Sequence, residues 1–298
     1  MKKWRERRAS AFAGILFLMI CFMAPEVRAA ENIILPDNAY MARNGKYRMQ
    51  IYDIEDGYLH VPYLPELPQH DYEWDCLKLD EGTGFLSYKD ENYKYAKTGI
   101  DVSKFQGDIN WEEVKKSGID FVIVRLGYRG YSNGKLVLDK KFTDHMNGAQ
   151  NVGLDVGVYF FSQAVNEQEA EEEAAFVIEQ LENYDIKHSV AFDTEKIKFD
   201  TSRTEGLTVK ELTQITKAFC EAIKLAGYKP MIYANAQWFT KKLDLTELMD
   251  YEFWYADYEY TDHGNTPLYP YKFRMWQYSD KGRIKGIDGD VDLNILFE

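Results

Sequence analysis

The sequence is poor in cysteine and histidine, with 3 Cys and 5 His among 298 residues. Cys21 lies near the N-terminus, while Cys76 and Cys220 fall in regions that we assign to different domains. We therefore expect two buried free thiols rather than a disulfide. No CxxC pair occurs and the histidines are scattered, which argues against a zinc site. We expect neither a metal nor another cofactor.

Cations are outnumbered as well: Lys and Arg total 36 against 49 Asp and Glu, so the formal net charge is −13. Nucleic-acid backbones and anionic membrane surfaces both bind clustered cations. The acidic balance therefore argues against either of them as a partner. The 45% hydrophobic content is that of a globular protein, and we expect a monomer.

The hydrophobic run near the N-terminus is too short to span a membrane comfortably. It covers residues 11–23, which is 13 residues, whereas a spanning helix needs about 20. Basic residues precede it at 2–8, and the sequence VRA at 27–29 follows it. This order is typical of a secretory signal peptide over residues 1–29 and predicts a secreted or cell-wall-associated protein. The alternative is an uncleaved N-terminal membrane anchor.

Residues 30–96 differ in character from the rest of the chain. They contain four of the 8 Pro and are rich in Tyr, Asp and Glu. Alternating runs at 47–52 and 58–61 predict short strands, and no helix of three turns is indicated. We interpret this segment as a small β-rich module or an extended spacer, and no motif in it indicates a function.

From residue 97 onward, short apolar runs alternate with amphipathic segments. The amphipathic segments predict helices at 111–117, 142–152, 166–182 and 208–226. The last of these helices begins with a capping box, Thr208 and Glu211, and stops at Gly227. The apolar runs predict eight strands, at 98–102, 121–126, 155–161, 189–192, 230–234, 253–256, 273–278 and 291–295.

Eight strands alternating with helices over about 200 residues favour a parallel α/β fold, and eight is the number that closes a barrel. The later connections are short, so we expect an irregular TIM-like β/α barrel with fewer than eight helices over residues 97–298. A doubly wound open sheet is the alternative. It usually has a Gly-rich phosphate turn after its first strand, and none is present here.

Ionisable residues gather where active residues of a parallel barrel lie, at the C-terminal ends of the strands. Several carboxylates at one barrel mouth repel each other, so such an arrangement is usually kept for function. Arg125 could contact a substrate or pair with a neighbouring acid. The residues at strand ends are Asp101, Arg125, Asp193, Glu195 and Asp257, and Asp292 enters the last strand.

Asp193 and Glu195 are the most informative pair. Side chains at i and i+2 of a strand point to the same side, so both carboxylates would face one opening. Glycoside hydrolysis needs one protonated and one ionised carboxyl group beside the scissile bond. A solvated strand end is the alternative for a single D-x-E. The acidic run 288–292 could mimic a calcium loop, but it lacks the glycine and the final glutamate of one.

Aromatic residues near the predicted strand ends suit a sugar substrate, because sugar rings have apolar faces that stack on aromatic side chains. Tyr159 and Phe161 share one face of the third strand, and Tyr233 and Tyr278 lie in later strands. Because the chain has 22 Tyr, packing in the core is the alternative for each single tyrosine, and the more common one.

Six short motifs then resemble, in order, the lysozymes of glycoside hydrolase family 25. They are GIDVS at 99–103, FVIVR at 121–125, GVYFF at 157–161, DTE at 193–195, WQY at 276–278 and DVDLN at 290–294. The resemblance implies a secreted N-acetylmuramidase that cleaves the β-1,4 bond between N-acetylmuramic acid and N-acetylglucosamine in the glycan strands of peptidoglycan. It has no counterpart for residues 30–96.

The resemblance also implies roles for individual residues. Glu195 would be the general acid/base, and Asp193 would be a nucleophile or would orient the substrate's N-acetyl group. Asp101 and Asp292 would complete the acidic cluster. Substrate contacts are expected from Arg125, Tyr159, Phe161, Tyr233, Asp257 and Gln277. The alternatives are a non-catalytic peptidoglycan-binding barrel and a hydrolase of another N-acetylated glycan.

Overall fold

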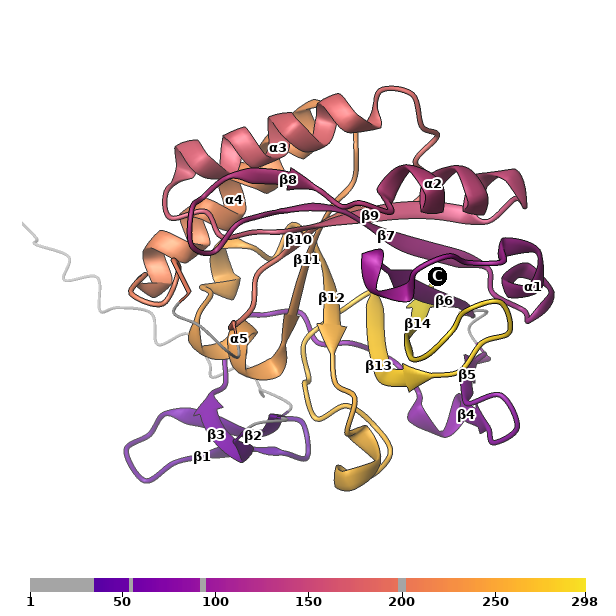
Figure 1. Cartoon of the computed structure of the whole chain (residues 1–298). Coiled ribbons are helices and arrows are strands. Elements are labelled where there is room, and N and C mark those ends of the chain that lie inside the picture. Colours follow the sequence, from indigo (N-terminus) through magenta and orange to yellow (C-terminus); the bar gives the residue numbers. More distant parts are fainter. Residues whose placement is uncertain (1–34, 54–55, 92–94, 198–201) are drawn as a thin grey trace, which may run out of the picture. The chain divides into compact units, whose positions relative to one another are not determined.

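The computed structural model describes residues 35–53, 56–91, 95–197 and 202–298, which form one compact unit (Figure 1). The signal peptide predicted over 1–29 lies outside the described residues. Within the described ranges, no helix is both long and apolar enough to cross a membrane.

Eight strands form a closed barrel, as predicted. Seven of them run parallel, and β14 is antiparallel to both of its neighbours, β13 and β6. The expectation of a wholly parallel sheet is therefore wrong for this strand. Only residues 283–290 join β13 to β14, and a parallel crossover needs about a dozen residues or more. The order around the barrel is β6 (Ala96–Val102), β7 (Phe121–Arg129), β9 (Asp155–Phe161), β10 (Val190–Asp193), β11 (Pro230–Asn235), β12 (Glu252–Ala256), β13 (Met275–Gly282) and β14 (Val291–Phe297).

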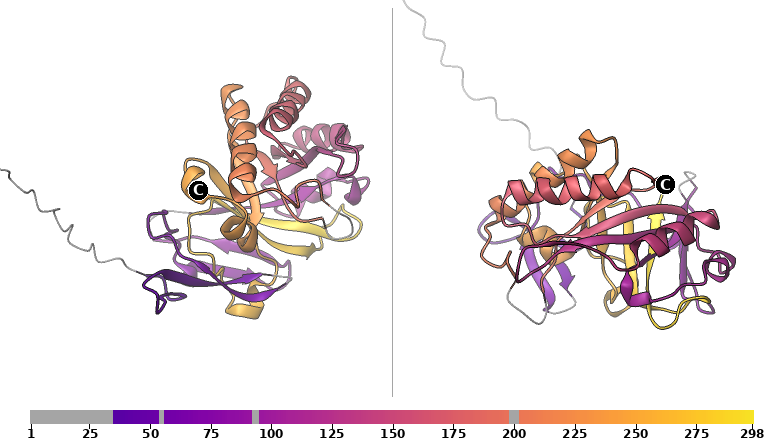
Figure 2. Two further views of the ribbon diagram at one scale, coloured as in Figure 1. Left: turned by 90° about the vertical axis from the view of Figure 1, so that its left-hand side faces the viewer. Right: turned by 45° about the horizontal axis from the view of Figure 1, so that its top comes forward.

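Helices cover the outside of the first half of the barrel, and Figure 2 shows α3 and α4 side by side on this face. The four predicted helices are confirmed as α1 (Trp111–Lys116), α2 (Phe142–Asn151), α3 (Glu167–Leu181) and α4 (Val209–Leu225). The capping box at Thr208 and Glu211 is present. Short elements escaped prediction: β8 (Leu136–Leu138), α5 (Ala236–Lys241) and the 3-10 turns η2 (Lys104–Gln106), η3 (Leu245–Glu247) and η4 (Tyr260–His263).

The N-terminal segment contains two small antiparallel sheets. One holds β1 (Ala39–Met41), β2 (Tyr47–Asp53) and β3 (Gly57–Pro62), and it confirms the strands predicted at 47–52 and 58–61. The other is the hairpin of β4 (Leu77–Asp80) and β5 (Phe85–Tyr88), which follows the 3-10 turn η1 (Trp74–Cys76).

This segment covers strands β12 to β14. In the described chain, none of these three strands is followed by an α-helix that could cover it. Tyr63 stacks on Tyr271 with ring centroids 5.9 Å apart, and Tyr72 stacks on Phe297 at 4.0 Å. The backbone N–H of Leu86 donates to the Tyr278 hydroxyl at 3.2 Å. The segment therefore takes the place of the missing helices and is not a spacer.

The barrel interior changes from apolar to polar along the strands. Phe121, Ile123 and Leu296 fill the end at which the parallel strands begin. Gly99 leaves room for the Phe121 ring there, since a Cβ on Gly99 would lie 2.2 Å from it. At the opposite end the inward positions carry carboxyl, amide and tyrosine side chains. Outside the barrel, Cys220 is buried and Cys76 is half-buried, and both are free thiols, as expected.

Candidate active site

A cavity of about 140 Å³ opens at the C-terminal ends of the parallel strands. The four acids of the predicted catalytic cluster line it, together with the predicted Tyr159, Tyr233 and Gln277. The barrel thus brings residues that are far apart in the sequence to one mouth, as expected for this fold. The complete lining is Asp101, Tyr159, Asp193, Glu195, Tyr233, Trp254, Tyr258, Gln277 and Asp292.

Asp101 and Asp292 are direct cross-strand partners, because β14 runs antiparallel to β6 and begins where β6 ends. Their side chains share a hydrogen bond, which requires a proton on one of the two carboxyl groups. Burial and the charge of Asp101 raise the pKa of Asp292 to about 9. Burial raises the pKa of Asp101 to about 6, against hydrogen bonds that favour its ionised form.

Asp193 is the last residue of β10 and points into the cavity. It is buried, and its Oδ1 has no hydrogen-bond partner. Burial and the charge of Glu195 raise the pKa of Asp193 well above its ordinary value. A buried acceptor without a partner costs free energy, so this oxygen is suited to receive a donor from a ligand.

Glu195 lies two residues beyond Asp193, after the strand has ended, and its side chain is exposed. The two acids therefore have contrasting surroundings, one buried at the base of the cavity and one at its mouth. Unequal surroundings push neighbouring carboxyl groups toward different protonation states. Acid/base chemistry on a glycan needs one protonated and one ionised carboxyl group, and a coupled pair of this kind can hold one proton between its two members.

Hydrogen bonds of amide and hydroxyl groups hold the other side chains of the cavity in position. The Gln277 amide donates to Asp101 at 2.6 Å, and its Oε1 lies 2.7 Å from the Tyr233 hydroxyl and 2.8 Å from that of Tyr258. Asn294 also donates to Asp101, at 2.8 Å. Burial raises the pKa values of Tyr233 and Tyr258 well above the ordinary range, so both hydroxyls keep their protons at neutral pH.

Sequence reasoning missed Trp254, Tyr258 and Asn294. Asn294 lies two residues after Asp292 on the same strand, so both side chains point into the barrel. The alternation of side chains along a strand could have indicated this. The Trp254 indole donates to the Asn294 side chain at 2.8 Å. Tyr258 follows β12 in an irregular segment, for which the sequence offers no periodic signal.

Three predicted substrate-contact residues lie outside the cavity lining. Arg125 pairs with Asp139, with 2.6 Å between Nη2 and Oδ2, as the alternative interpretation expected. Its charge still opposes the rise in the pKa of Asp193. Asp257 lies 3.1 Å from the His263 ring, and Phe161 is half-buried at the end of β9.

The calcium-loop interpretation of residues 288–292 receives no support. Asp290 pairs with Arg283 at 2.8 Å, while Asp292 is bonded to Asp101. Among the residues that the structure covers, no group of three or more His, Cys, Asp or Glu is arranged to hold a metal ion.

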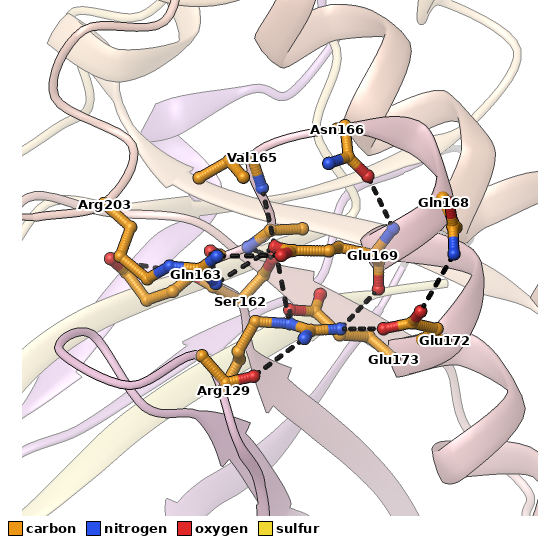
Figure 3. Close-up of polar contacts among 12 residues, drawn as sticks. Arg129, Ser162, Gln163, Val165, Asn166, Gln168, Glu169, Glu172, Glu173 and Arg203 are labelled. Carbon is orange, nitrogen blue, oxygen red and sulfur yellow. Dashed lines mark hydrogen bonds and ion pairs between the residues drawn. The ribbon is translucent and has the colours of Figure 1, made fainter.

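The turn at Ser162 and Gln163 is bonded to Asp193 and also to Ser202 and Arg203, and Figure 3 shows the contact between Arg203 and Gln163. At Asp193 itself, the backbone N–H of Ser162 donates to the Asp193 carbonyl at 2.9 Å. Farther along the chain, Arg203 donates to the Gln163 carbonyl at 3.0 Å, and Ser202 donates to the Gln163 side chain at 2.8 Å.

Helix α3 holds this turn through two glutamates (Figure 3). Glu169 accepts both Nη atoms of Arg203, at 3.0 and 2.7 Å. Glu173 is fully buried and accepts from the Arg129 Nε at 2.8 Å, while its Oε2 has no hydrogen-bond partner. Polar groups of Ser162 and Gln163 lie close enough to Glu173 to favour its ionised form. Burial raises the pKa of Glu173 to about 7.

We expect Glu173→Ala to lower the free energy of unfolding by about 3–5 kcal/mol, because it removes the one fully buried carboxylate among those that pair with the buried Arg129 guanidinium. Glu172 pairs with the same arginine through a half-exposed side chain, so Glu172→Ala should cost no more than about 1 kcal/mol. Urea unfolding of both variants measures the difference. Equal losses would contradict a supporting role for the buried glutamate.

We also expect Asp292→Asn to change how stability depends on pH. The raised pKa means that folded Asp292 keeps a proton that the unfolded chain releases, so stability falls as pH rises from about 4 to about 9. Asparagine can still donate to Asp101 but carries no titrating proton. Near pH 8 the variant should be more stable than the wild type by at least about 1 kcal/mol, and near pH 5 by less.

Thermal unfolding across this range tests the effect, with Asp290→Asn as a control on an exposed neighbour. A stability gain for Asp292→Asn that does not grow with pH would show that the Asp101–Asp292 pair holds no extra proton.

A β/α barrel with crowded carboxyl groups and aromatic side chains at its C-terminal mouth has the architecture of a glycoside hydrolase. Comparison with known proteins narrows this class. Residues 100–287 match the sequence model of Glycosyl hydrolases family 25, and the chain belongs to this family. The resemblance seen in the sequence is thereby confirmed.

Among curated relatives, the autolytic lysozyme of Clostridium acetobutylicum is 26% identical over 200 residues, which are 67% of this chain and 56% of that protein. The chain thus matches little more than half of that relative's length. Among solved structures, the modular autolysin LytC of Streptococcus pneumoniae has a TM-score of 0.59 at 22% identity, covering 89% of this chain and 62% of that one. A family 25 glycosyl hydrolase from Bacillus anthracis has a TM-score of 0.56 at 21% identity, covering 70% and 92%. Both likenesses show the fold.

Proposed function

We propose that this protein hydrolyses peptidoglycan at the β-1,4 bond between N-acetylmuramic acid and N-acetylglucosamine. The observation that carries the proposal is the cavity that Asp193 and Glu195 line together with the Asp101–Asp292 pair. Membership of family 25 supports it. Two of the similar proteins support it as well: the clostridial relative is named an autolytic lysozyme, and LytC was solved in complex with a synthetic peptidoglycan ligand.

Glu195 is the general acid and base in this proposal. It stands at the open mouth of the cavity, where it can reach both the glycosidic oxygen and solvent water. In the first step Glu195 gives its proton to the leaving oxygen as the bond from that oxygen to the anomeric carbon breaks. In the second step water bonds to the anomeric carbon and returns a proton to Glu195.

Asp193 orients the N-acetyl group of the substrate. Its unpartnered Oδ1 can accept the acetamido N–H, which turns the acetamido oxygen toward the anomeric carbon. That oxygen bonds to the carbon in the first step and is displaced by water in the second. The accepted N–H bond favours the ionised form of Asp193 and so opposes the rise in its pKa that burial causes. The resulting carboxylate stabilises the positive charge that develops at the anomeric carbon. Attack by Asp193 itself is the alternative.

The remaining cavity residues bind and position the sugar. The half-buried Tyr159 offers aromatic surface, and the buried Trp254 ring supports it edge-on with ring centroids 6.1 Å apart. Tyr233 and Gln277 offer polar groups to the sugar's substituents. Asp101 and Asp292 share a proton and so keep the acidic base of the cavity from carrying its full negative charge.

Export to the cell wall completes the proposal. Residues 1–29 have the pattern of a signal peptide, and the alternative is a retained N-terminal anchor. Several structural neighbours carry names that refer to wall lysis, among them a spore cortex lytic enzyme of Clostridium perfringens. We propose that the protein acts outside the membrane, as a monomer, on the glycan strands.

Digestion of purified peptidoglycan, followed by mass analysis of the new reducing ends, tests this function. Muramic acid at those ends is the expected result. Glucosamine ends would show cleavage of the other bond of the strand. Binding to peptidoglycan without new reducing ends would favour a non-catalytic barrel, and cleavage of chitin oligosaccharides alone would favour another N-acetylated glycan.

A further inference from the structure

The sheet of β1 to β3 is fixed beside the mouth of the cavity. Two residues of this sheet region bond to the end of β11 and the start of α5: Asp53, the last residue of β2, accepts from Asn235 at 3.3 Å, and Asp56, just before β3, accepts from Gln237 at 2.6 Å. Helix α5, which begins there, packs on β2 and β3 (Figure 1). The sheet therefore lies against residues at the C-terminal end of the barrel strands.

A second link joins the sheet to the segment after β12. The Tyr52 hydroxyl donates to Glu259 at 3.0 Å, and the Tyr52 ring lies 4.7 Å from the His263 ring. Glu259 directly follows Tyr258, which lines the cavity. The surface that carries Tyr52 is therefore continuous with the cavity rim.

The two faces of this sheet differ in chemistry. Alternation along the strands turns Met49, Ile51 and Val61 inward, where all three are buried. The opposite face, which we term the tyrosine face, mixes aromatic rings with hydrogen-bonding groups. It consists of Tyr40, Arg48, Gln50, Tyr52, Tyr58 and His60.

The aromatic rings of the tyrosine face are open to solvent but arranged in pairs. Tyr40 is 40% exposed and meets the His60 ring edge-on at 5.8 Å. Tyr58 is 51% exposed and meets the Tyr52 ring edge-on at 5.3 Å. Single exposed tyrosines are ordinary, but two supported pairs on one small face mark a binding surface.

We propose that the tyrosine face binds the glycan strand of peptidoglycan beyond the sugars held in the cavity, an inference that rests on the proposed function. Sugar rings stack their apolar faces on aromatic side chains, and Gln50, Arg48 and His60 offer partners to hydroxyl, acetamido and carboxyl groups. A polar face of this kind suits a hydrated polymer better than a second protein copy, whose interface core would be depleted in charge.

The double variant Tyr40→Ala/Tyr58→Ala tests the proposal in the full-length chain. Binding to insoluble peptidoglycan is measured by co-sedimentation in the Glu195→Gln background, where cleavage does not interfere. We expect the Kd to rise about tenfold, as two lost stacking contacts would give. Tyr95→Ala is the matched control, because Tyr95 is 49% exposed but precedes β6, at the opposite end of the barrel.

A second readout separates this proposal from the proposed function. In the active background, the double variant should raise KM for polymeric peptidoglycan far more than KM for a soluble tetrasaccharide made from it. An unchanged Kd, an equal loss in the Tyr95→Ala control, or equal changes in KM for both substrates would overturn the proposal. Sedimentation of the protein without peptidoglycan gives a further check. If the wild type had the mass of a dimer and the double variant that of a monomer, the tyrosine face would join two copies, and the proposal would be overturned. Failure of the wild type to release reducing ends would overturn the catalytic function, while the binding result would still decide the role of the face.

Discussion

Glu195→Gln is expected to lower kcat on peptidoglycan by a factor of about 10³ or more, with little change in KM. Glutamine keeps the size of the side chain but cannot give or take a proton, and acid/base catalysis contributes about 10²–10⁴-fold in each direction of proton transfer. Release of reducing ends over time measures kcat. The fold should be unaffected, since the Glu195 side chain is exposed.

Glu205→Gln is the matched control, because Glu205 is also exposed and lies on the same connection between β10 and α4. It should retain the wild-type rate. If Glu195→Gln kept more than a tenth of the wild-type kcat, Glu195 would not be the proton donor, and another group at the cavity mouth would have to take this role.

Removal of residues 35–95 is expected to prevent the barrel from folding. Burial of one large apolar side chain contributes about 1.5–3 kcal/mol, and a whole domain is stable by only about 5–15 kcal/mol. The loss would therefore exceed the stability of the fold and would expose the aromatic side chains of β12 to β14. Seven apolar side chains of this segment are fully packed in the core: Met49, Ile51, Val61, Tyr63, Leu67, Leu86 and Tyr88.

Solubility and far-UV circular dichroism of the shortened chain, compared with the full chain, measure this effect. A pair of point variants in one hairpin gives a graded version of the test. Leu86 is buried and its cross-strand partner Leu79 is half exposed, so Leu86→Ala should cost about 2–5 kcal/mol and Leu79→Ala under about 1 kcal/mol. A shortened chain that folds cooperatively would show that the barrel needs no cover on this side.

The positions of the strands and long helices followed from the sequence because each has a local period. All eight barrel strands were predicted, and Asp193 and Glu195 could be placed at a strand end by chain order alone. The direction of β14 could not be obtained in this way, because periodicity is the same for both directions. The short link at 283–290 carried that information.

Contacts between distant segments were beyond the reach of the sequence. The stacking of Tyr63 on Tyr271 joins residues about 200 positions apart, and local patterns give no hint of it. Arg125 shows the same limit. Its place at a strand end suggested a substrate contact, but Asp139, beyond the β8 strand, supplies its partner.

The central claim is that the scissile sugar–sugar bond lies between Glu195 and Asp193 in the barrel mouth. A crystal structure of the Glu195→Gln variant with an uncleaved peptidoglycan fragment tests it most directly. The account predicts the glycosidic oxygen within hydrogen-bond distance of residue 195 and the acetamido N–H on Asp193 Oδ1. A fragment seated with its β-1,4 bonds away from both side chains would contradict it.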